Sequence, residues 1–305
     1  MGRYRPLRLA VFMLSLSMTA CTGHSTAPAP QNAPGALQSV DSRRMVLYVA
    51  GLNPLVNFYT ASLRAHDPLP LGSITHDITR ASGLWVDKNG TLYVIDTGYP
   101  AKVLEYRRGA TKPFRTITNG LYAPIEPAVD ASGTLYVDDY QNGAVVLVYP
   151  PGKLSPSRSI AFPHTGRLAP GKMAFDQKGD IIVASFDVEH QIGTVFSISP
   201  GASMAVDMGL DNPPGGVAGT DAKGNIYVGS EAGGINVYAP GSKQVARSID
   251  AGATGFYSSF SVTGDGTIYW PNYDDGSMYE FAPGASGPSN IFPNAGGVDA
   301  AVGPR

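Results

Sequence analysis

The sequence contains one cysteine, Cys21, among 305 residues, so no disulfide can form within the chain. Charged residues make up only 15 %, and the 22 Lys and Arg are balanced by 24 Asp and Glu without an arginine-rich run, which argues against a nucleic-acid-binding protein. Long helices are excluded as well, because 37 Gly and 25 Pro would interrupt them repeatedly. The hydrophobic content of 43 % is nevertheless sufficient for a packed core.

The familiar motifs of catalytic and nucleotide-binding sites are missing too. The sequence has no Gly-x-Ser-x-Gly, no His-Glu-x-x-His and no Gly-x-Gly-x-x-Gly. Residues 166–173 imitate a phosphate loop, but Met173 stands where the magnesium-binding Ser or Thr belongs, and a predicted strand rather than a helix follows. None of these motifs therefore indicates an enzyme.

The first twenty residues predict an export signal. Three arginines precede the apolar stretch 9–18, which is about half as long as a bilayer-spanning helix. The segment 18–21, Met-Thr-Ala-Cys, resembles the lipobox of bacterial lipoproteins. This resemblance implies that Cys21 is lipidated and anchors the protein in the bacterial cell envelope, at the outer membrane or the cell surface. The alternative is an ordinary signal peptide with an incidental cysteine.

The sequence thus predicts three parts: a lipoprotein signal peptide over 1–20, the lipidated Cys21 with a flexible tether over 21–42, and one folded domain over 43–305. Pro, Ala, Ser and Gly dominate the tether, which shows no hydrophobic periodicity. Its fully extended reach is roughly 70 Å, which would let the folded domain stand away from the membrane.

The folded domain is one unit repeated six times. In the second to fifth units an apolar stretch ends in Asp-x-x-Gly and leads into an apolar triplet, most clearly over 87–94 and 130–137. The sixth unit has Thr263 in place of Asp, and the first unit has only the triplet. The triplets centre on Tyr48, Tyr93, Tyr136, Ile182, Tyr227 and Tyr269, which are 42 to 46 residues apart. Such a period, with short strands rich in Val, Ile and Tyr between Gly and Pro turns, is typical of a four-stranded propeller blade.

We therefore expect an all-β, six-bladed β-propeller. Each triplet lies on the second strand of its blade, where Asp-x-x-Gly closes the preceding hairpin. The first unit begins directly at its second strand, 45–49, and lacks an inner strand. The C-terminal segment 296–302 contains a Val-Asp pair like Val86-Asp87, and we expect it to supply that missing strand. The two ends of the chain would then close the ring without a free edge.

With these repeats, the sequence resembles the NHL-type β-propellers. Their relatives include the regucalcin and gluconolactonase group and the streptogramin lyases. The resemblance covers residues 43–302 and implies the architecture strongly and the function weakly, because this fold carries enzymes, binding scaffolds and sensors. WD-type propellers fit less well, since no Trp-Asp dipeptide occurs.

The long and varied loops are expected on one face of the ring, where strands two and three are joined and where one blade leads into the next. Binding usually lies in such loops. The candidate binding residues on this face are Glu126, Asp138, Asp139, Tyr140, Lys172, Glu189, His190, Tyr257, Tyr273 and Asp274. Residues 138–143 also imitate the start of a calcium loop, but they lack its later ligands, so a polar hairpin loop is the simpler interpretation.

Two functions compete. We expect a lipid-anchored, non-catalytic binding or scaffold module, acting as a monomer on a protein or glycan of the cell envelope and touching the membrane only through its anchor. No cofactor is predicted, although the carboxylates would suit a divalent cation such as Ca²⁺. The alternative is a metal-dependent hydrolase of the lactonase kind, or a lyase, with its site at the mouth of the central channel near Glu126 and Lys172. The resemblance to the regucalcin-like and lyase propellers implies a site at the mouth of the channel, but a full set of their metal ligands cannot be aligned with this sequence.

Overall fold

The computed structural model describes residues 45–304, except residue 62 and the segments 64–67, 141–142, 164–167, 188–189, 191, 230–232 and 255–258. The described residues belong to one compact unit within Asp41–Arg305. The predicted signal peptide, Cys21 and the tether lie outside the described residues. In the described part of the chain there is no helix, and so none long and apolar enough to cross a membrane.

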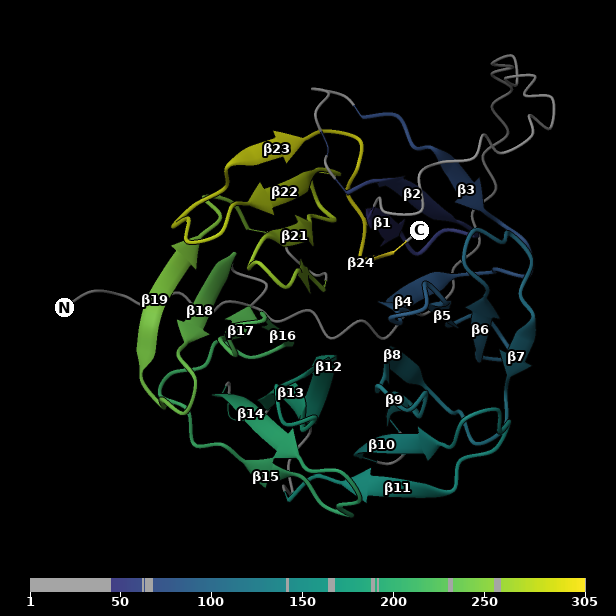
Figure 1. The fold of residues 1–305 in the computed structure, drawn as a ribbon, viewed down its shortest axis with the longest axis horizontal. Coiled ribbons are helices and arrows are strands. Elements are labelled where there is room, and N and C mark those ends of the chain that lie inside the picture. Colours follow the sequence, from purple (N-terminus) through teal and green to yellow (C-terminus); the bar gives the residue numbers. More distant parts are fainter. Residues whose placement is uncertain are drawn as a thin grey trace. The chain divides into compact units, whose positions relative to one another are not determined.

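The described strands form six four-stranded antiparallel sheets, which are the blades of a β-propeller (Figure 1). Blade one contains β24 (Asp299–Pro304), β1 (Met45–Ala50), β2 (Val56–Thr60) and β3 (Gly72–Ile74). Blade two contains β4 (Ala81–Val86), β5 (Leu92–Asp96), β6 (Lys102–Tyr106) and β7 (Arg115–Ile117). Blade three contains β8 (Pro124–Val129), β9 (Leu135–Tyr140), β10 (Ala144–Tyr149) and β11 (Arg158–Ala161).

The remaining blades follow the same order. Blade four contains β12 (Leu168–Phe175), β13 (Ile181–Asp187), β14 (Ile192–Ile198) and β15 (Val206–Asp207). Blade five contains β16 (Val217–Thr220), β17 (Ile226–Gly229), β18 (Gly234–Tyr238) and β19 (Val245–Asp250). Blade six contains β20 (Ser261–Val262), β21 (Ile268–Pro271), β22 (Met278–Phe281) and β23 (Asn290–Phe292). The prediction of a six-bladed, all-β propeller is confirmed.

The repeated Asp-x-x-Gly sequence makes the hairpin between the first and second strands of a blade. In blade two, Asp87 Oδ1 accepts hydrogen bonds from the backbone N–H groups of Asn89 and Thr91, each at 2.8 Å. Gly90 closes the same turn with a φ of +81°, a conformation that costs glycine little. Blades three, four and five repeat the arrangement with Asp130, Asp176 and Asp221.

The hydrophobic core consists of six clusters, one at each junction between neighbouring blades. Between blades one and two, for example, Tyr48 and Phe58 pack with Leu84, Leu104 and Tyr106. The other five clusters join each blade to the next around the ring and return from blade six to blade one. Because each blade buries both of its faces against its neighbours, the second strands can be apolar along almost their whole length.

The ring closes through the C-terminal strand, as the sequence predicts. Strand β24 pairs antiparallel with β1 in a register from Met45↔Pro304 to Ala50↔Asp299. One detail differs from the expected alignment: Asp299 is the first residue of β24, whereas Asp87 follows the last residue of β4 in a turn. The shared Val-Asp pair therefore does not mark equivalent positions, and Asp299 lies instead at the opposite end of its inner strand.

The propeller has two distinct faces. We call the loop face the side with the connections between strands two and three and between blades, and the turn face the side with the Asp-x-x-Gly turns and the turns between strands three and four. The two kinds of turn lie side by side in blade two. A Cβ added to Gly90, in the Asp-x-x-Gly turn, would stand 2.9 Å from Cγ of Arg108, in the turn between β6 and β7. It would also stand 2.7 Å from the carbonyl oxygen of Pro304, at the end of β24. Strand β1 starts on the turn face, so the chain enters the propeller there, at Met45.

Candidate functional site

The inner strands of blades two, three and four carry the same irregularity near the loop face. Their pairing with the second strand shifts between Ala81 and Leu84, between Pro124 and Pro127, and between Pro170 and Met173. A β-bulge bends its strand and turns a side chain in a new direction. These bulges contain Gly83, Glu126 and Lys172, so the local backbone brings two charged residues to the centre of the ring.

Lys172 crosses the ring centre from blade four to blade one. Its Nζ lies 2.6 Å from Asp299 Oδ1 and 2.7 Å from the carbonyl oxygen of Ala300, both on β24, and 3.3 Å from the carbonyl oxygen of Leu84 in blade two. Asp299 Oδ2 in turn accepts a hydrogen bond from the Leu84 backbone N–H at 2.5 Å. This buried ion pair thus connects two opposite blades and the blade beside them.

Glu126 makes a second connection across the ring. Ser259, two residues before β20 of blade six, donates its hydroxyl to Glu126 Oε1 of blade three at 2.5 Å. Both side chains are buried, and Glu126 is only 4 % exposed. Together with Lys172 and Asp299, these residues form a polar group that we call the central cluster. Its members are bonded in two pairs, Lys172 with Asp299 and Ser259 with Glu126.

The acids of the central cluster are unusually hard to ionise. Burial raises the pKa of Glu126 well above its ordinary value, and the nearby Asp299 carboxylate raises it further, whereas Lys172 and Ser259 lower it. Burial also raises the pKa of Asp299 to about 6, against the lowering effect of the Lys172 ammonium group. Because Glu126 Oε2 has no hydrogen-bond partner in the described structure, a proton on this carboxyl group would relieve an unfavourable buried charge.

Two predicted loop carboxylates prove to be buried strand residues. Asp138 and Asp139 were expected in an exposed hairpin loop, but both lie in β9 and have no solvent exposure. Asp139 accepts the backbone N–H groups of Tyr122 and Ala123, at 2.9 and 3.1 Å, where the chain enters blade three. For Asp139 the expectation failed because a carboxylate that receives backbone hydrogen bonds can be buried at the end of a strand.

Asp138 differs from Asp139 because neither of its oxygens has a hydrogen-bond partner in the described structure. Burial raises its pKa well above the ordinary value, and the charge of Asp139 adds to this effect. Asp138 also raises the pKa of Glu126, so it lies near the central cluster. The remaining residue of this predicted group, Tyr140, ends β9 and is half-buried.

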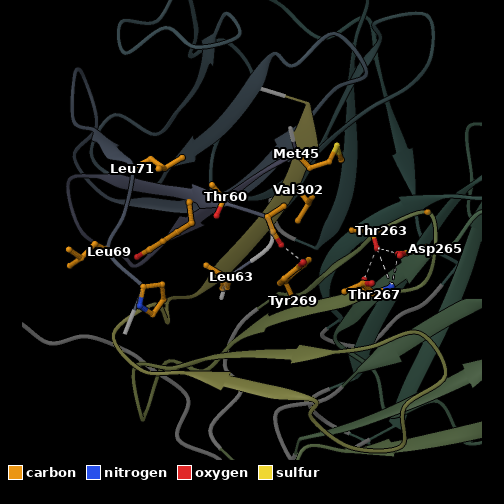
Figure 2. A pocket seen from close by; sticks show the side chains of 14 residues that line it. Met45, Thr60, Leu63, Leu69, Leu71, Thr263, Asp265, Thr267, Tyr269 and Val302 are labelled. Atoms are coloured by element: carbon orange, nitrogen blue, oxygen red, sulfur yellow. Dashed lines mark hydrogen bonds between the residues drawn. The ribbon is translucent and has the colours of Figure 1, made fainter. Parts of the chain in front are cut away.

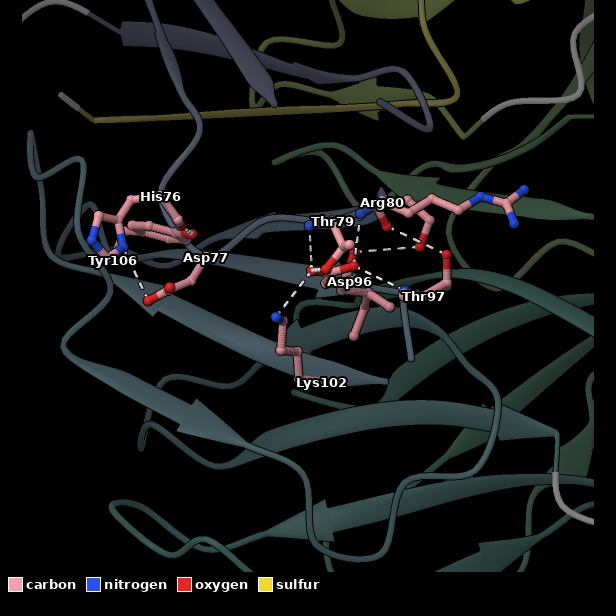
Figure 3. Close-up of polar contacts among 11 residues, drawn as sticks. His76, Asp77, Thr79, Arg80, Asp96, Thr97, Lys102 and Tyr106 are labelled. Carbon is pink, nitrogen blue, oxygen red and sulfur yellow. Dashed lines mark hydrogen bonds and ion pairs between the residues drawn. The ribbon is translucent and has the colours of Figure 1, made fainter. Parts of the chain in front are cut away.

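The residue of blade two that corresponds to Asp139 is Asp96, whose hydrogen bonds are drawn in Figure 3. There Asp96 accepts hydrogen bonds from Thr79 N, Arg80 N and Gly98 N at 2.7 to 2.9 Å, and Lys102 Nζ lies 3.4 Å away. Although burial alone raises the pKa of Asp96, these N–H groups outweigh it and lower the pKa below the ordinary value. The carboxylate therefore fixes the entry of the chain into the blade, which is a structural role.

The other candidates on the loop face are more accessible. His190 has a side chain that is 63 % exposed, and its Nδ1 lies 2.8 Å from Asp187 Oδ2. Tyr273 is 49 % exposed, and Asp274 beside it is exposed and donates its backbone N–H to Asn272 Oδ1. Glu189 and Tyr257 lie outside the described residues. The eight described candidates thus comprise four buried residues, the half-buried Tyr140 and three exposed residues on the loop face.

Further exposed groups lie on the loop face. Tyr99 and Tyr122 are the most exposed tyrosines of the described chain, at 103 % and 73 %. A hollow of about 520 Å³ opens where blades four and five meet, between Phe186 and Ile192 on one side and Leu210 on the other. Ile192, at its edge, is 58 % exposed. This face therefore offers aromatic and apolar side chains to a partner.

Sequence reasoning missed Asp299 and Ser259 as members of the central cluster. Neither stands in a recognisable motif, and their partners come from the opposite side of the ring. The only available signal was the position of Asp299 at the start of the closing strand. Among the described residues, no group of three or more His, Cys, Asp or Glu side chains is arranged to hold a metal ion.

Comparison with known proteins supports the fold and does not assign a family. No family model matches the chain, and no curated protein sequence matches it either. A chain from the crystal structure of a nidogen/laminin complex is similar, with a TM-score of 0.67, 13 % identity and coverage of 85 % of this chain and 98 % of that chain. A protein of unknown function from Bacteroides caccae is similar with a TM-score of 0.63, 12 % identity and the same coverage of both chains. At these identities the likeness establishes the six-bladed propeller fold alone.

Proposed function

We propose that this protein is a non-catalytic binding module of the bacterial cell envelope, anchored through a lipid on Cys21 and acting as a monomer through its loop face. Its repeat would be of the NHL type. The observation that carries the binding role is the distribution of exposed tyrosines. Tyr99, Tyr122 and Tyr273 are the described tyrosines classed as exposed, and all three lie on the loop face.

Exposed tyrosines suit a binding surface for a physical reason. A tyrosine ring contributes a large contact area with few rotatable bonds, so little conformational entropy is lost when a partner binds. The hollow beside Ile192 could accept an apolar group of that partner. The nidogen/laminin neighbour comes from a complex of proteins, and we propose a protein or a glycan of the cell envelope as the partner.

The burial of the central cluster gives no support to the alternative of a lactonase-like hydrolase or a lyase. Lys172 is 5 % exposed, Glu126 is 4 % exposed, and Asp299 is fully buried. Their hydrogen bonds are directed at one another and at backbone carbonyl groups across the ring. This arrangement favours a structural role, and we do not propose catalysis there. A divalent cation such as Ca²⁺ on the exposed carboxylates of the loop face remains part of the binding proposal.

The binding face is tested with a matched pair of triple variants. A photo-reactive amino acid at position 273 would first identify the partner in cells of the native host. We then expect Tyr99→Ala, Tyr122→Ala and Tyr273→Ala together to weaken its binding at least about tenfold, since each hot-spot residue contributes more than about 1 kcal/mol. The matched control changes three apolar residues of the turn face, Phe114, Leu154 and Met204, to Ala. If only the control variant loses binding in a titration, the loop face is not the site.

The anchor is tested separately. Cys21→Ser should abolish lipidation, so the chain should move from the detergent phase to the aqueous phase in a phase-partitioning experiment with cells of the native host. The same variant should keep its affinity for the partner, because Cys21 is outside the propeller. Unchanged detergent partitioning would show that Cys21 is not the anchor.

A further inference from the structure

The exposed positive charges of the propeller are collected on the turn face. Nine of the described Lys and Arg side chains are exposed, and eight of them belong to turn-face turns. Blade two carries Lys88, Arg107, Arg108 and Lys112, and blades three to five carry Lys153, Lys178, Lys223 and Lys243. The ninth, Arg80, is on the loop face. This collection occurs in a chain whose formal net charge is −2.

Three other arginines of the turn face are half-buried and serve the fold. Arg115 forms an ion pair with the buried Glu105. Arg158 and Arg247 each donate from NH1 to a backbone carbonyl group of the next blade, those of Ala202 and Ala285. The turn aspartates likewise accept N–H groups of their own turns. Lys88 donates to the carbonyl oxygen of Ala131 at 2.9 Å. The other exposed lysines of this face extend into solvent and can contact a partner.

Apolar side chains accompany these lysines along the rim. Five large hydrophobic residues of the segments between strands three and four are exposed: Leu69, Leu71, Phe114, Leu154 and Met204, at 44 % to 83 %. They come from blades one to four. Exposed basic and apolar side chains on the same surface are the combination with which proteins lie on anionic lipid bilayers.

The place where the chain enters the propeller belongs to the same face. Met45, the first described residue, is 44 % exposed and borders a hollow of about 980 Å³ between blades six and one. Figure 2 shows Leu69, Leu71 and Met45 around this hollow, with Thr263 and Asp265 on its other side. The first described residue of the propeller, Met45, therefore belongs to its basic and apolar side.

We propose that the turn face docks on an anionic lipid surface, so that the loop face points away from the membrane. The lysines would contact phosphate groups, and Leu69, Leu71, Phe114, Leu154 and Met204 would enter the boundary between headgroups and acyl chains. A basic face also orients a molecule before contact, because a negative membrane repels the exposed carboxylates of the opposite loop face, those of Asp77, Asp211, Asp250, Asp274 and Asp275. The proposal extends the proposed function by fixing which side of the module is available to its partner.

The test uses the chain from residue 22 onward, which lacks the signal segment and Cys21. This part folds on its own, since all six blades and their six core clusters lie within residues 45–304. Its binding to phosphatidylcholine vesicles with and without phosphatidylglycerol is measured by co-sedimentation. We expect binding only to the vesicles with phosphatidylglycerol, and weaker binding as salt is raised. Because no anchor is present, this result does not depend on lipidation or on the loop-face partner.

Matched single-charge variants locate the surface. Lys178→Gln should weaken vesicle binding about fivefold, as expected for one lysine near an anionic surface. Arg80→Gln removes the same charge from the loop face and should leave binding unchanged. The four substitutions Lys153→Gln, Lys178→Gln, Lys223→Gln and Lys243→Gln together should reduce it more than about a hundredfold. Leu154→Ser with Met204→Ser should reduce the binding that persists at high salt.

Three results would overturn the proposal. The first is equal binding to both kinds of vesicle or to neither. The second is an equal loss of vesicle binding from Arg80→Gln and Lys178→Gln, which would mean that binding depends on the total charge of the protein and not on the turn face. The third is a pair of observations: the protein binds duplex DNA as tightly as the vesicles, and the substitutions of Leu154 and Met204 have no effect on vesicle binding. The turn face would then recognise polyanions in general and not a lipid surface.

Discussion

Asp138 stands at a position that the other described blades fill with small or apolar residues. Its equivalent in blade two is Ile95, which precedes Asp96 as Asp138 precedes Asp139, and the equivalent in blade four is Ala184. Ile95 and Ala184 belong to the clusters between blades. A carboxyl group without a hydrogen-bond partner in such surroundings costs stability whenever it is ionised.

We therefore predict that Asp138→Asn stabilises the protein at neutral and alkaline pH. Because burial raises the pKa of Asp138, the native state is not penalised at pH values below about 4, where the unfolded chain is also protonated. Above that pH the unfolded state loses its proton first, and stability falls as pH rises toward the raised pKa. The gain from Asp138→Asn should exceed about 1 kcal/mol near pH 8 and vanish near pH 4. Denaturant unfolding at both pH values measures it.

Asp96→Asn is the matched control with the opposite sign. The pKa of Asp96 is lowered, because its backbone hydrogen bonds outweigh burial, so its contribution to stability is present above the unfolded pKa and is lost as pH falls. Asp96→Asn should therefore destabilise the protein most near neutral pH. If Asp138→Asn also destabilises near pH 8, its carboxylate has a favourable interaction that the described contacts do not contain.

At the scale of strands, the sequence predicts the repeat well and the bulges not at all. The second strands expected around Tyr93 and Tyr136 are β5 and β9, and the strand expected over 45–49 is β1. These predictions succeed because alternation, turn residues and period are local in the sequence. The bulges at Glu126 and Lys172 depend on how neighbouring inner strands approach, which no local pattern records.

Contacts between residues far apart in the sequence also explain why some predictions about the candidate site were wrong. Lys172 occurs in a segment that imitates a phosphate loop, yet it forms an ion pair with Asp299, 127 residues away in the sequence. Asp138 and Asp139 looked like loop residues because carboxylates are seldom buried. Tyr273 and His190 are exposed in loops that connect the second and third strands of their blades, and their role in binding stays a prediction. Long-range partners, rather than residue type, decide which polar residues are available.

The inner strands approach one another so closely that glycine is required between blades four and five. A Cβ on Gly171 of β12 would stand 1.5 Å from the carbonyl oxygen of Gly216, which directly precedes β16. We predict that Gly171→Ala forces the two strands apart and lowers stability by more than about 2 kcal/mol, as overpacking against a rigid backbone does. Thermal unfolding measures the effect.

Gly234→Ala provides the control for this prediction. Gly234 starts β18, has no positive φ, and a Cβ at this position would meet nothing within 4 Å. Its replacement should change the unfolding temperature little or raise it slightly. Equal effects of the two substitutions would mean that the loss at Gly171 reflects general intolerance of glycine replacement and not the contact between β12 and β16.

At the scale of the whole molecule, ring closure and the central cluster depend on the same segment. Strand β24 supplies the inner strand of blade one and also Asp299, the partner of Lys172 from the opposite blade. The closing strand is therefore held both by its ladder with β1 and by a charge pair through the centre of the ring. A tail that merely covered an edge would make only the first of these contacts.

Deletion of residues 296–305 should consequently lower the stability of the protein by more than the loss of an ordinary edge strand would. It removes the ladder with β1, the buried side chains of Ala300 and Ala301, and the carboxylate that compensates the buried Lys172 ammonium group. An unpaired buried charge alone costs about 3–5 kcal/mol, so the truncated chain should unfold at a much lower temperature or remain unfolded. Adding a synthetic 296–305 peptide should restore folding, and the same peptide with Asp299→Ala should restore less of it. If the truncated chain melts at the temperature of the full chain, neither the ladder nor the ion pair across the ring closes the propeller.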